Sequence, residues 1–475
     1  MTGTLANNKK AEEAARRELY ALREPTPTKR SRRLPSPEKE RSQSAFKAGL
    51  LLISPRAKIS LNGTSTLMSK TLRVLYAAGP GNVIETYHHW VEGRDDPSQV
   101  SITYSSQFYE VCRAMDAQAY VISSHREKKF LRDEQFTIEH RPIPFRFSSG
   151  LLYHLGQLWN GLRLIVTALR QRSNVVVVAD GTTHWFVLSL LPGLGVQVIP
   201  SLHCMLWCKY LPQSTIEKWL LTLSRNLFAN QCTAILVASD EISEQLVQLT
   251  GSHNLPIVLF LPTYRRTEFA EVGEPDENRK PFRVMFAGRI ESDKGVFDLL
   301  EIAKRFAALG RQDISFDICG NGSVLEELRK AASEAGVEES FACHGYCNKP
   351  QMRAMFNRAH AVIVPTKTDF VEGFNQVVVE GVLSRRPVVT SDVCPALSYV
   401  REAVVEVPPD DILEYGNALL KLCDDRTFYE EKRRNCLMLQ EQFYDSSQSW
   451  GAMLKSVLAA MQKEKISQQK QEINI

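Results

Sequence analysis

Short apolar runs recur along the chain, and each is followed by a polar turn and then a stretch with apolar residues at helical spacing. This alternation predicts parallel strands that are covered on both faces by helices. The predicted strands lie at 72–78, 119–122, 175–179, 198–203 and 234–237 in the first half, and at 282–287, 361–364 and 387–389 in the second half, with two more beginning at 314 and 341. The pattern therefore predicts an α/β fold with two Rossmann-like domains.

The boundaries follow from changes in composition along the chain. Residues 263–280 are rich in charge and lack an apolar period, which is typical of a connection between domains. We predict the following organisation: a basic extension over 1–67, a first Rossmann-like domain over 68–264, a linker over 265–280, a second Rossmann-like domain over 281–440, a helix over 441–462 and a fraying tail over 463–475.

A loop after the strand at 361–364 carries two acids in a setting that favours ligand binding. The loop reaches Glu372-Gly373-Phe374-Asn375, and Glu380 follows in the next helix, eight positions after Glu372. In open α/β sheets ligands bind at the carboxyl ends of the strands, and a helix N-terminus offers free N–H groups to a phosphate or sugar oxygen. The pattern therefore indicates a ligand with both hydroxyls and phosphates, such as a nucleotide sugar. An ordinary αβ unit with two solvated acids is the alternative.

A second loop places two cations after the strand at 282–287. Gly288 permits a tight exit, and Arg289 and Lys294 follow before a helix that begins at Val296. A planar guanidinium and an ammonium beside a helix N-terminus are suited to hold a diphosphate. We interpret this loop as a diphosphate clamp, against the alternative of a solvated basic loop.

The acid pair resembles the E-x7-E signature of retaining glycosyltransferases of family 4, which have the GT-B fold. The resemblance covers about residues 70–462, and it implies two Rossmann-like domains that face each other across a cleft, with a last helix that crosses back onto the first domain. It implies that Glu372 contacts hydroxyls of the donor sugar, that Glu380 holds the ribose, and that Arg289 and Lys294 stabilise the leaving diphosphate. The chain departs from the family at Asn375, where Gly is frequent, and at Gly381, where Ala is usual.

The same resemblance assigns further positions. It makes His203, at the end of a predicted strand, the active-site candidate of the first domain, against the alternative of a histidine hydrogen-bonded in a loop. It places Gly79, Gly81 and Asn82 in a loop that faces the acceptor. The predicted donor-binding residues are Gly288, Arg289, Lys294, Gly320, Gly345, Glu372, Gly373, Phe374, Asn375 and Glu380.

Charge is distributed unevenly over this 475-residue chain of net charge +4. Residues 1–67 hold 14 Lys or Arg and 6 Asp or Glu, so they carry +8 while the rest carries −4. Such a segment is expected to be disordered. The chain lacks a run of 18 apolar residues, and its 10 cysteines have irregular spacing, which predicts a reduced, cytoplasmic protein without a bound metal. The stretches 151–170 and 209–227 are interpreted as core-facing helices, with peripheral contact at a membrane surface as the sharper alternative.

The resulting prediction is a retaining glycosyltransferase that moves a sugar from a nucleotide-sugar donor to a glycan, lipid-linked or small-molecule acceptor. A UDP-sugar is the donor that the resemblance favours, no cofactor is expected, and nucleic acid is not expected as a partner. Two alternatives remain open. A nucleotide-sugar epimerase would use His203 and Asp180 as acid and base, and a non-catalytic protein would bind the nucleotide sugar without turnover.

Overall fold

The structure is a computed structural model, and it describes residues 71–98, 101–143, 150–276, 278 and 280–473. Residues 69–475 form one compact unit, which contains all the elements below. The predicted basic extension over 1–67 lies outside the described residues.

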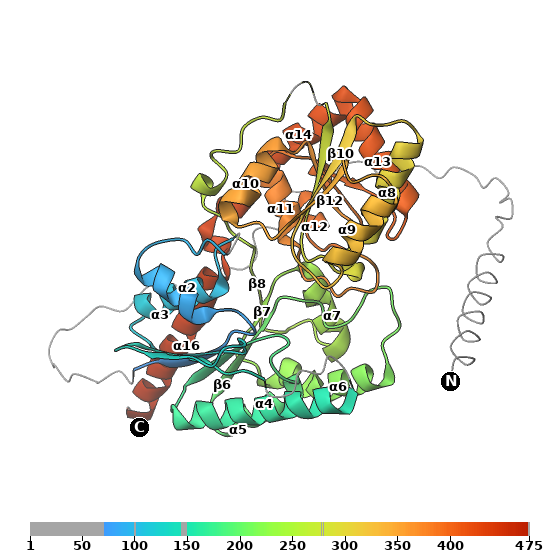
Figure 1. Ribbon diagram of the computed structural model, residues 1–475. Helices are drawn as coiled ribbons and strands as arrows, with labels where there is room; N and C mark the ends of the chain where they lie inside the picture. Colours follow the sequence, from blue (N-terminus) through green and yellow to red (C-terminus); the bar gives the residue numbers. More distant parts are fainter. Residues whose placement is uncertain (1–70, 99–100, 144–149, 277, 279, 474–475) are drawn as a thin grey trace, which may run out of the picture. The chain divides into compact units, whose positions relative to one another are not determined.

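The first half of this unit is built on an eight-stranded sheet (Figure 1). Its strand order is β3-β4-β2-β1-β5-β6-β7-β8, and all neighbours are parallel except β3 and β4. The strands are β1 (Arg73–Ala77), β2 (Gln118–Ser123), β3 (Phe130–Arg132), β4 (Phe136–His140), β5 (Val175–Ala179), β6 (Gln197–Leu202), β7 (Ile235–Val237) and β8 (Ile257–Leu259). Because Ala77 pairs with Ile122 in a parallel register, the carboxyl ends of β1 and β2 open onto the same edge.

Helices connect these strands, and several begin at a polar capping residue. The Asn82 side chain accepts a hydrogen bond from the Glu85 N–H, and Ser214 forms a reciprocal capping box with Glu217. The helical elements are α2 (Val83–Val91), α3 (Tyr104–Ala114), α4 (Gly150–Arg170), η1 (Trp185–Ser189), α5 (Leu190–Gly193), α6 (Thr215–Asn226), the π-helix η2 (Leu227–Gln231) and α7 (Asp240–Thr250).

The second half is built on a six-stranded, fully parallel sheet with the order β11-β10-β9-β12-β13-β14. Its strands are β9 (Phe282–Ala287), β10 (Ile314–Cys319), β11 (Phe341–Gly345), β12 (Ala361–Val364), β13 (Val388–Thr390) and β14 (Val404–Glu406). Its helical elements are η4 (Ser292–Lys294), α8 (Val296–Ala308), α9 (Leu325–Glu334), α10 (Lys349–Arg358), α11 (Gln376–Leu383), α12 (Leu397–Val400), η5 (Arg401–Ala403), α13 (Ile412–Asp424) and α14 (Arg426–Leu439). The predicted α/β class with two parallel sheets is confirmed.

The connection between the two sheets is packed. It contains η3 (Arg266–Glu268), and Phe269 and Val272 are buried in the same core as residues of both sheets. The Glu268 carboxylate lies 3.3 Å from Lys349 Nζ and 3.5 Å from Arg353 Nη2. Glu268 of the predicted linker therefore forms ion pairs with two residues of α10.

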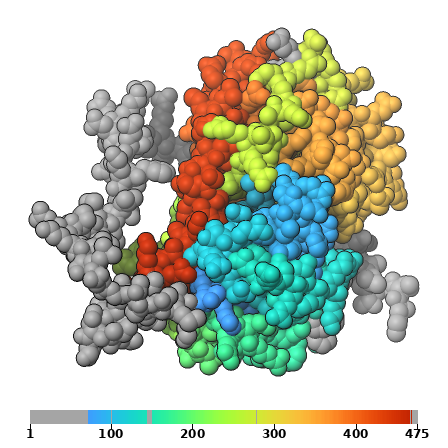
Figure 2. All heavy atoms as spheres, turned by 90° about the vertical axis from the view of Figure 1, so that its left-hand side faces the viewer, coloured from blue at the N-terminus to red at the C-terminus, as the bar shows by residue number. Residues whose placement is uncertain are grey.

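The C-terminal segment runs through α15 (Glu441–Tyr444) and η6 (Ser446–Gln448) into α16 (Trp450–Ile473), which packs against α3 of the first half. Figure 2 shows this red helix beside the blue and cyan residues of the first half. Trp450 is fully buried, and its indole N–H donates to Ser201 Oγ over 2.8 Å. The sequence pattern predicts a helix over 441–462 and a fraying tail over 463–475. In the structure α16 continues through most of that tail, to Ile473.

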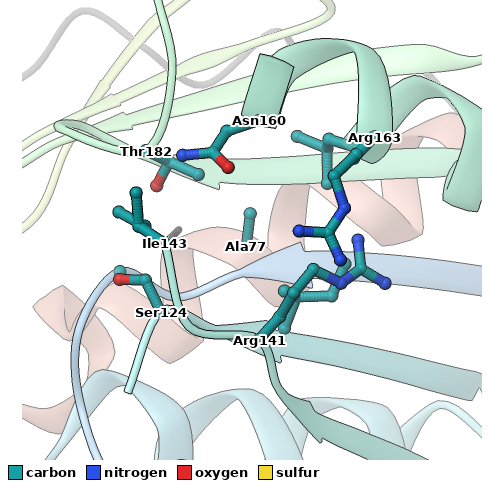
Figure 3. A pocket seen from close by; sticks show the side chains of 10 residues that line it. Ala77, Ser124, Arg141, Ile143, Asn160, Arg163 and Thr182 are labelled. Carbon is teal, nitrogen blue, oxygen red and sulfur yellow. The ribbon is translucent and has the colours of Figure 1, made fainter. Parts of the chain in front are cut away.

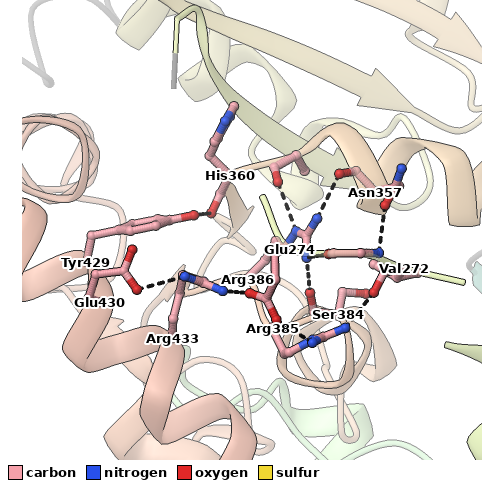
Figure 4. Close-up of polar contacts among 12 residues, drawn as sticks. Val272, Glu274, Asn357, His360, Ser384, Arg385, Arg386, Tyr429, Glu430 and Arg433 are labelled. Atoms are coloured by element: carbon pink, nitrogen blue, oxygen red, sulfur yellow. Dashed lines mark hydrogen bonds and ion pairs between the residues drawn. The ribbon is translucent and has the colours of Figure 1, made fainter. Parts of the chain in front are cut away.

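A buried arginine anchors the back of the second sheet. Arg386 has no exposed surface, and its guanidinium donates to the carbonyls of Ala359, Gly273, Ser384 and Asn357 (Figure 4). Burial lowers its pKa to about 10. Arg386 therefore satisfies carbonyls that the chain turns leave without secondary-structure partners.

Candidate functional site

The cation loop leaves β9 at Gly288 and lies directly on the loop that follows β12. Gly295 has φ +70°, and a Cβ atom there would lie 2.1 Å from the Pro365 carbonyl oxygen. Glycine is therefore required at this contact, both for the backbone conformation and for the close approach. The helix α8 begins at Val296, as its apolar face predicts.

The close approach of the two loops brings a predicted cation and a predicted acid together. Lys294 Nζ lies 2.7 Å from Glu372 Oε2, and each side chain is 12% exposed. Asn375 Nδ2 donates to the same carboxylate oxygen over 3.1 Å. The Glu372 carboxylate is thus held by two donors at the carboxyl edge of the sheet, where the acid pattern predicted it.

An aromatic ring that the sequence analysis missed supports both cations. Lys294 Nζ lies 3.5 Å from the centre of the Phe370 ring, and the Arg289 guanidinium lies 5.4 Å from it. A ring face attracts cations, so Phe370 holds the two positive groups on one side of the loop. The available sequence signal was an aromatic residue two positions before the first acid of the pair.

The departure at Asn375 has a conformational explanation. Asn375 has φ +69° and stands immediately before α11. Residues other than glycine rarely adopt this left-handed conformation, but asparagine tolerates it because its short polar side chain forms local hydrogen bonds. Asn375 therefore preserves the backbone turn that a glycine provides, and adds a donor to Glu372.

The acid loop also contacts the predicted histidine of the first half. A Cβ atom on Gly373 would lie 1.6 Å from the His203 carbonyl oxygen, so the two backbones are in direct contact. Asp180 Oδ2 accepts the N–H groups of His203 and Cys204 over 2.8 and 2.7 Å. Asp180 therefore positions the loop after β6, although the sequence supported it less strongly than His203.

A chain of hydrogen bonds orients the His203 ring. Trp450 donates to Ser201 Oγ, and Ser201 Oγ lies 2.9 Å from His203 Nε2. With its oxygen accepting from the indole, the serine hydroxyl can donate to Nε2, which leaves the imidazole proton on Nδ1. Burial lowers the pKa of His203, with Asp180 acting in the opposite direction. The ring is thus neutral near pH 7, and the buried Nδ1 has no hydrogen-bond partner within the described residues.

The second acid of the pair lies deeper. Glu380 is 2% exposed, and the Tyr264 hydroxyl donates to its Oε1 over 3.3 Å. Burial raises the pKa of Glu380 to about 7, and Arg353 acts in the opposite direction. The two carboxylates therefore have different environments, since Glu372 is paired with a cation and Glu380 is paired with a neutral phenol.

Three other predicted donor-binding residues have packing roles. The Phe374 side chain is buried, with its ring centre 5.3 Å from that of Tyr399, so it packs the loop against α12. A Cβ atom on Gly320 would lie 1.7 Å from the Gly288 carbonyl oxygen, and the Gly345 carbonyl accepts the Gly320 N–H over 2.8 Å. These glycines hold the loops after β9, β10 and β11 against each other.

The predicted acceptor loop borders a small pocket at the carboxyl edge of the first sheet (Figure 3). Gly79 and Ser124 line it from strand ends, and Asn160 and Arg163 line it from α4, beside Arg141. Its accessible volume is about 40 Å³. Gly81 and Asn82 are structural here, because the Gly81 carbonyl accepts the Ser123 hydroxyl and Asn82 caps α2.

The site as a whole combines two cations, one paired carboxylate and a neutral imidazole at the contact between the two sheets. Such a set can bind an anionic group through Arg289 and Lys294 and can hydrogen-bond hydroxyls through Glu372 and His203. Among the described residues, no cluster of three or more His, Cys, Asp or Glu side chains could hold a metal ion. The helices of the same residues include none that could span a membrane.

Two family models match the chain, one on each half. Residues 268–437 match the model described as glycosyl transferases group 1, and residues 103–261 match the model described as glycosyltransferase family 4. The two matches meet near the packed connection between the sheets.

Individual proteins show the same likeness. Alpha-D-kanosaminyltransferase of Streptomyces kanamyceticus is 27% identical over 166 residues, which span 34% of this chain and 42% of that relative. The crystal structure of HepE from Anabaena in complex with UDP has a TM-score of 0.56 at 13% identity, covering 83% of this chain and 100% of that one. Sucrose-phosphate synthase from Thermosynechococcus elongatus has a TM-score of 0.59 at 14% identity, covering 83% and 99%. These likenesses confirm the predicted fold, GT-B.

Proposed function

Because the chain belongs to the group 1 glycosyltransferases, we propose that it transfers a sugar from a nucleotide-sugar donor to an acceptor hydroxyl with retention at the anomeric carbon. The single observation that supports this most is the joint placement of Lys294, Glu372 and His203. A UDP-sugar is the proposed donor, a choice consistent with the UDP-bound structure of HepE.

The proposed roles follow from the charge of each group. Arg289 and Lys294 bind the diphosphate and stabilise the negative charge that grows on it as the bond to the sugar breaks. Glu372 accepts hydrogen bonds from sugar hydroxyls, while Glu380 binds the ribose. Since Glu380 is 2% exposed and accepts a hydrogen bond from Tyr264, ribose binding requires the side chains that cover this carboxyl to move aside.

Retention requires that the new bond form on the face from which the diphosphate departs. In the proposed reaction the bond between the anomeric carbon and the diphosphate oxygen breaks, and the acceptor oxygen bonds to that carbon on the same face. The acceptor proton passes to the departing diphosphate oxygen. His203, neutral and with Nδ1–H free of protein partners within the described residues, donates a hydrogen bond to the sugar and remains protonated on Nδ1 throughout.

The acceptor is proposed to enter beside the loop that contains Gly79. Ser124, Asn160 and Arg163 place polar groups at the small pocket there, which suits a single hydroxyl of an acceptor. Glycans, lipid-linked sugars and many small molecules all carry hydroxyls, so the pocket does not distinguish among these three classes of acceptor.

A donor assay tests the proposal. The full chain is incubated with a panel of UDP-, GDP-, ADP- and TDP-sugars, and released nucleotide and sugar products are measured with and without a mixture of acceptors. We expect slow donor hydrolysis with one class of donor, and retained configuration in the released or transferred sugar. If the product were an epimerised nucleotide sugar, the protein would be an epimerase. If the donor bound without any turnover, the protein would be a non-catalytic binding protein.

A further inference from the structure

An exposed apolar stripe runs along the whole outer face of α4. Seven large apolar side chains of this helix are between 43% and 73% exposed: Leu151, Leu152, Leu155, Trp159, Leu162, Val166 and Leu169. Apart from Leu152, they follow each other at intervals of three or four residues, which places them on one side of the helix. The opposite side, including Leu164, Ile165 and Ala168, is buried in the core. The helix is thus apolar on two faces, and one of them has no partner among the described residues.

The stripe continues on neighbouring elements. On α6, Ile216, Trp219 and Leu223 are exposed at the same helical spacing, with Trp219 59% exposed. Leu190 and Leu194 are exposed at α5, and Tyr210 and Leu211 in the loop before α6. The helices α4, α5 and α6 all contact η1, and Figure 1 shows them along one side of the first sheet. We call this surface the apolar face.

The segment that carries the apolar face is poor in acids. Residues 150–226 contain six Lys or Arg (Arg163, Arg170, Arg172, Lys209, Lys218 and Arg225) but two acids, Asp180 and Glu217. Asp180 is engaged by the backbone of the His203 loop. Of the cations, Arg170, Arg172 and Lys218 are exposed at or near the helix ends, whereas the Arg225 guanidinium donates to the Thr250 carbonyl. The outer surface of this segment is therefore both apolar and positively charged.

We propose that the apolar face docks on the surface of an anionic lipid bilayer. A helix that lies in the bilayer interface buries apolar side chains among the acyl chains, while Lys and Arg reach the headgroups with their charged ends. Anionic lipids also attract each Lys or Arg that lies near the bilayer surface. Exposed apolar side chains and exposed cations occur together on α4 and α6. Trp159 and Trp219 are of the residue type that is enriched at the boundary between acyl chains and headgroups.

Charge argues against two other occupants. A second copy of the chain would place one cationic face on another, and residues 1–67 carry a net charge of +8, so both would be repelled by the surface that they cover. A bilayer with anionic headgroups has the opposite sign and also provides an apolar layer. It is therefore the occupant that matches both properties of the face.

Docking would also bring the candidate site close to the bilayer. The loop Cys204–Ser214 connects His203 directly to α6, and it carries the exposed Tyr210 and Leu211 of the face. On the other side, α4 lines the pocket beside Gly79 with Asn160 and Arg163. A bound enzyme would thus present the acceptor side of its cleft near the membrane surface, where an amphiphilic acceptor is concentrated.

Vesicle flotation with the full chain tests the docking. Vesicles are made of phosphatidylcholine alone or with 30% phosphatidylglycerol, and the variant Leu155→Gln/Trp159→Gln/Trp219→Gln is compared with the unchanged chain. The matched control is Leu309→Gln/Leu413→Gln/Met438→Gln, because these side chains are equally exposed but lie in the second half. We expect the face variant to lose at least tenfold in partition onto anionic vesicles, and the control to stay within twofold.

Two further measurements make the result decisive. The variant Arg170→Glu/Lys218→Glu should lose binding to anionic vesicles while its binding to neutral vesicles stays unchanged, since it removes the charge and keeps the apolar stripe. Near-ultraviolet dichroism and melting temperature should match those of the unchanged chain in all variants. Equal vesicle binding by the face variant and the control would overturn the proposal. So would a concentration-dependent dimer that the face variant abolishes, because a second copy would then cover the face.

Discussion

Two groups of cations in the second half illustrate opposite uses of positive charge. Arg386 is fully buried and donates to main-chain carbonyls, whereas Lys294 and Arg289 lie at the carboxyl edge of the sheet against Glu372 and the Phe370 ring. Every partner of Arg386 belongs to the fold itself. The partners of Lys294 are the side chains of Glu372 and Phe370 in the loop after β12. The kind of partner, main-chain carbonyl or side chain, therefore distinguishes a cation that stabilises the fold from one that is a candidate for ligand binding.

The largest expected effect is on turnover at the cleft cations. Lys294→Ala and Arg289→Ala should each lower kcat by about a hundredfold or more, since each removes a preorganised donor to the leaving group. Arg289→Ala removes an exposed side chain and should change the free energy of unfolding by about 1 kcal/mol or less. Lys294→Ala removes the cation paired with the largely buried Glu372 carboxylate, so it should lower the free energy of unfolding by more than Arg289→Ala does. Lys304→Ala, which removes an exposed lysine paired with Glu301, is the control. Near-normal turnover at saturating donor in either variant would remove the diphosphate assignment.

The interior cation should behave in the opposite way. Arg386→Met retains the apolar stem but strands the buried carbonyls of Ala359 and Ser384 and removes two part-buried contacts, so we expect a loss of about 3 kcal/mol or more in the free energy of unfolding. The kcat of the folded fraction should be unchanged. Urea unfolding followed by fluorescence measures the first quantity, and active-site titration followed by turnover measures the second. Arg401→Met, at an exposed pair with Glu406, should be nearly neutral, and an equal effect in both variants would contradict the anchoring role.

Burial of Glu380 should make the stability of the protein depend on pH. The pKa of Glu380 is raised to about 7, so between about pH 4.5 and 7 the unfolded chain releases a proton that the folded chain keeps. Stability from this group is therefore present at low pH and is lost as pH rises to 7, by about 3 kcal/mol. Glu380→Gln removes the ionisation, so this variant should be more stable than the unchanged chain at pH 8 and similar to it at pH 4.5. Thermal melts across this range test the sign. The exposed Glu334→Gln serves as control.

The smallest expected effects separate the two acids of the pair kinetically. Glu372→Gln weakens an interaction with a sugar that gains positive charge, so its loss should fall on the single-turnover rate, by about tenfold to a hundredfold. Glu380→Gln weakens a contact with the unreacting ribose and should mainly raise the dissociation constant of the donor. Stopped-flow rates and calorimetry on both variants give the two quantities. If Glu372→Gln changed affinity alone, Glu372 would be a binding residue without a role in the reacting state.

Much of the fold could be predicted because apolar runs identify buried strands. β5, β9 and β12 begin and end at the predicted residues. In contrast, β3, β4, β8 and β14 were missed, because they are short and lie at or near sheet edges, and β3, β4 and β14 are also only partly apolar. Edge strands bury one face at most, so their sequences lack the continuous apolar run that was used as the signal.

The site was predicted less completely, for a different reason. Spacing along the chain brought Glu372 and Lys294 to strand ends, and the contact between them follows from sheet order. The roles of Phe370, Tyr264 and Trp450 depend on contacts between residues far apart in the chain, and these have no local pattern. Arg386 adjoins another arginine in a polar-looking turn, so its complete burial could not be inferred from residue type.

The position of Trp450 has a consequence for how the protein is made. This side chain fills the core of the first half between Tyr76 and Tyr104, yet it is added after the whole second sheet. At roughly 5–20 residues per second, synthesis of residues 262–450 takes on the order of 10–40 s. During that time the first half has emerged from the ribosome with a gap in its interior, so the newborn chain depends on its own C-terminus, or on a chaperone, to close it.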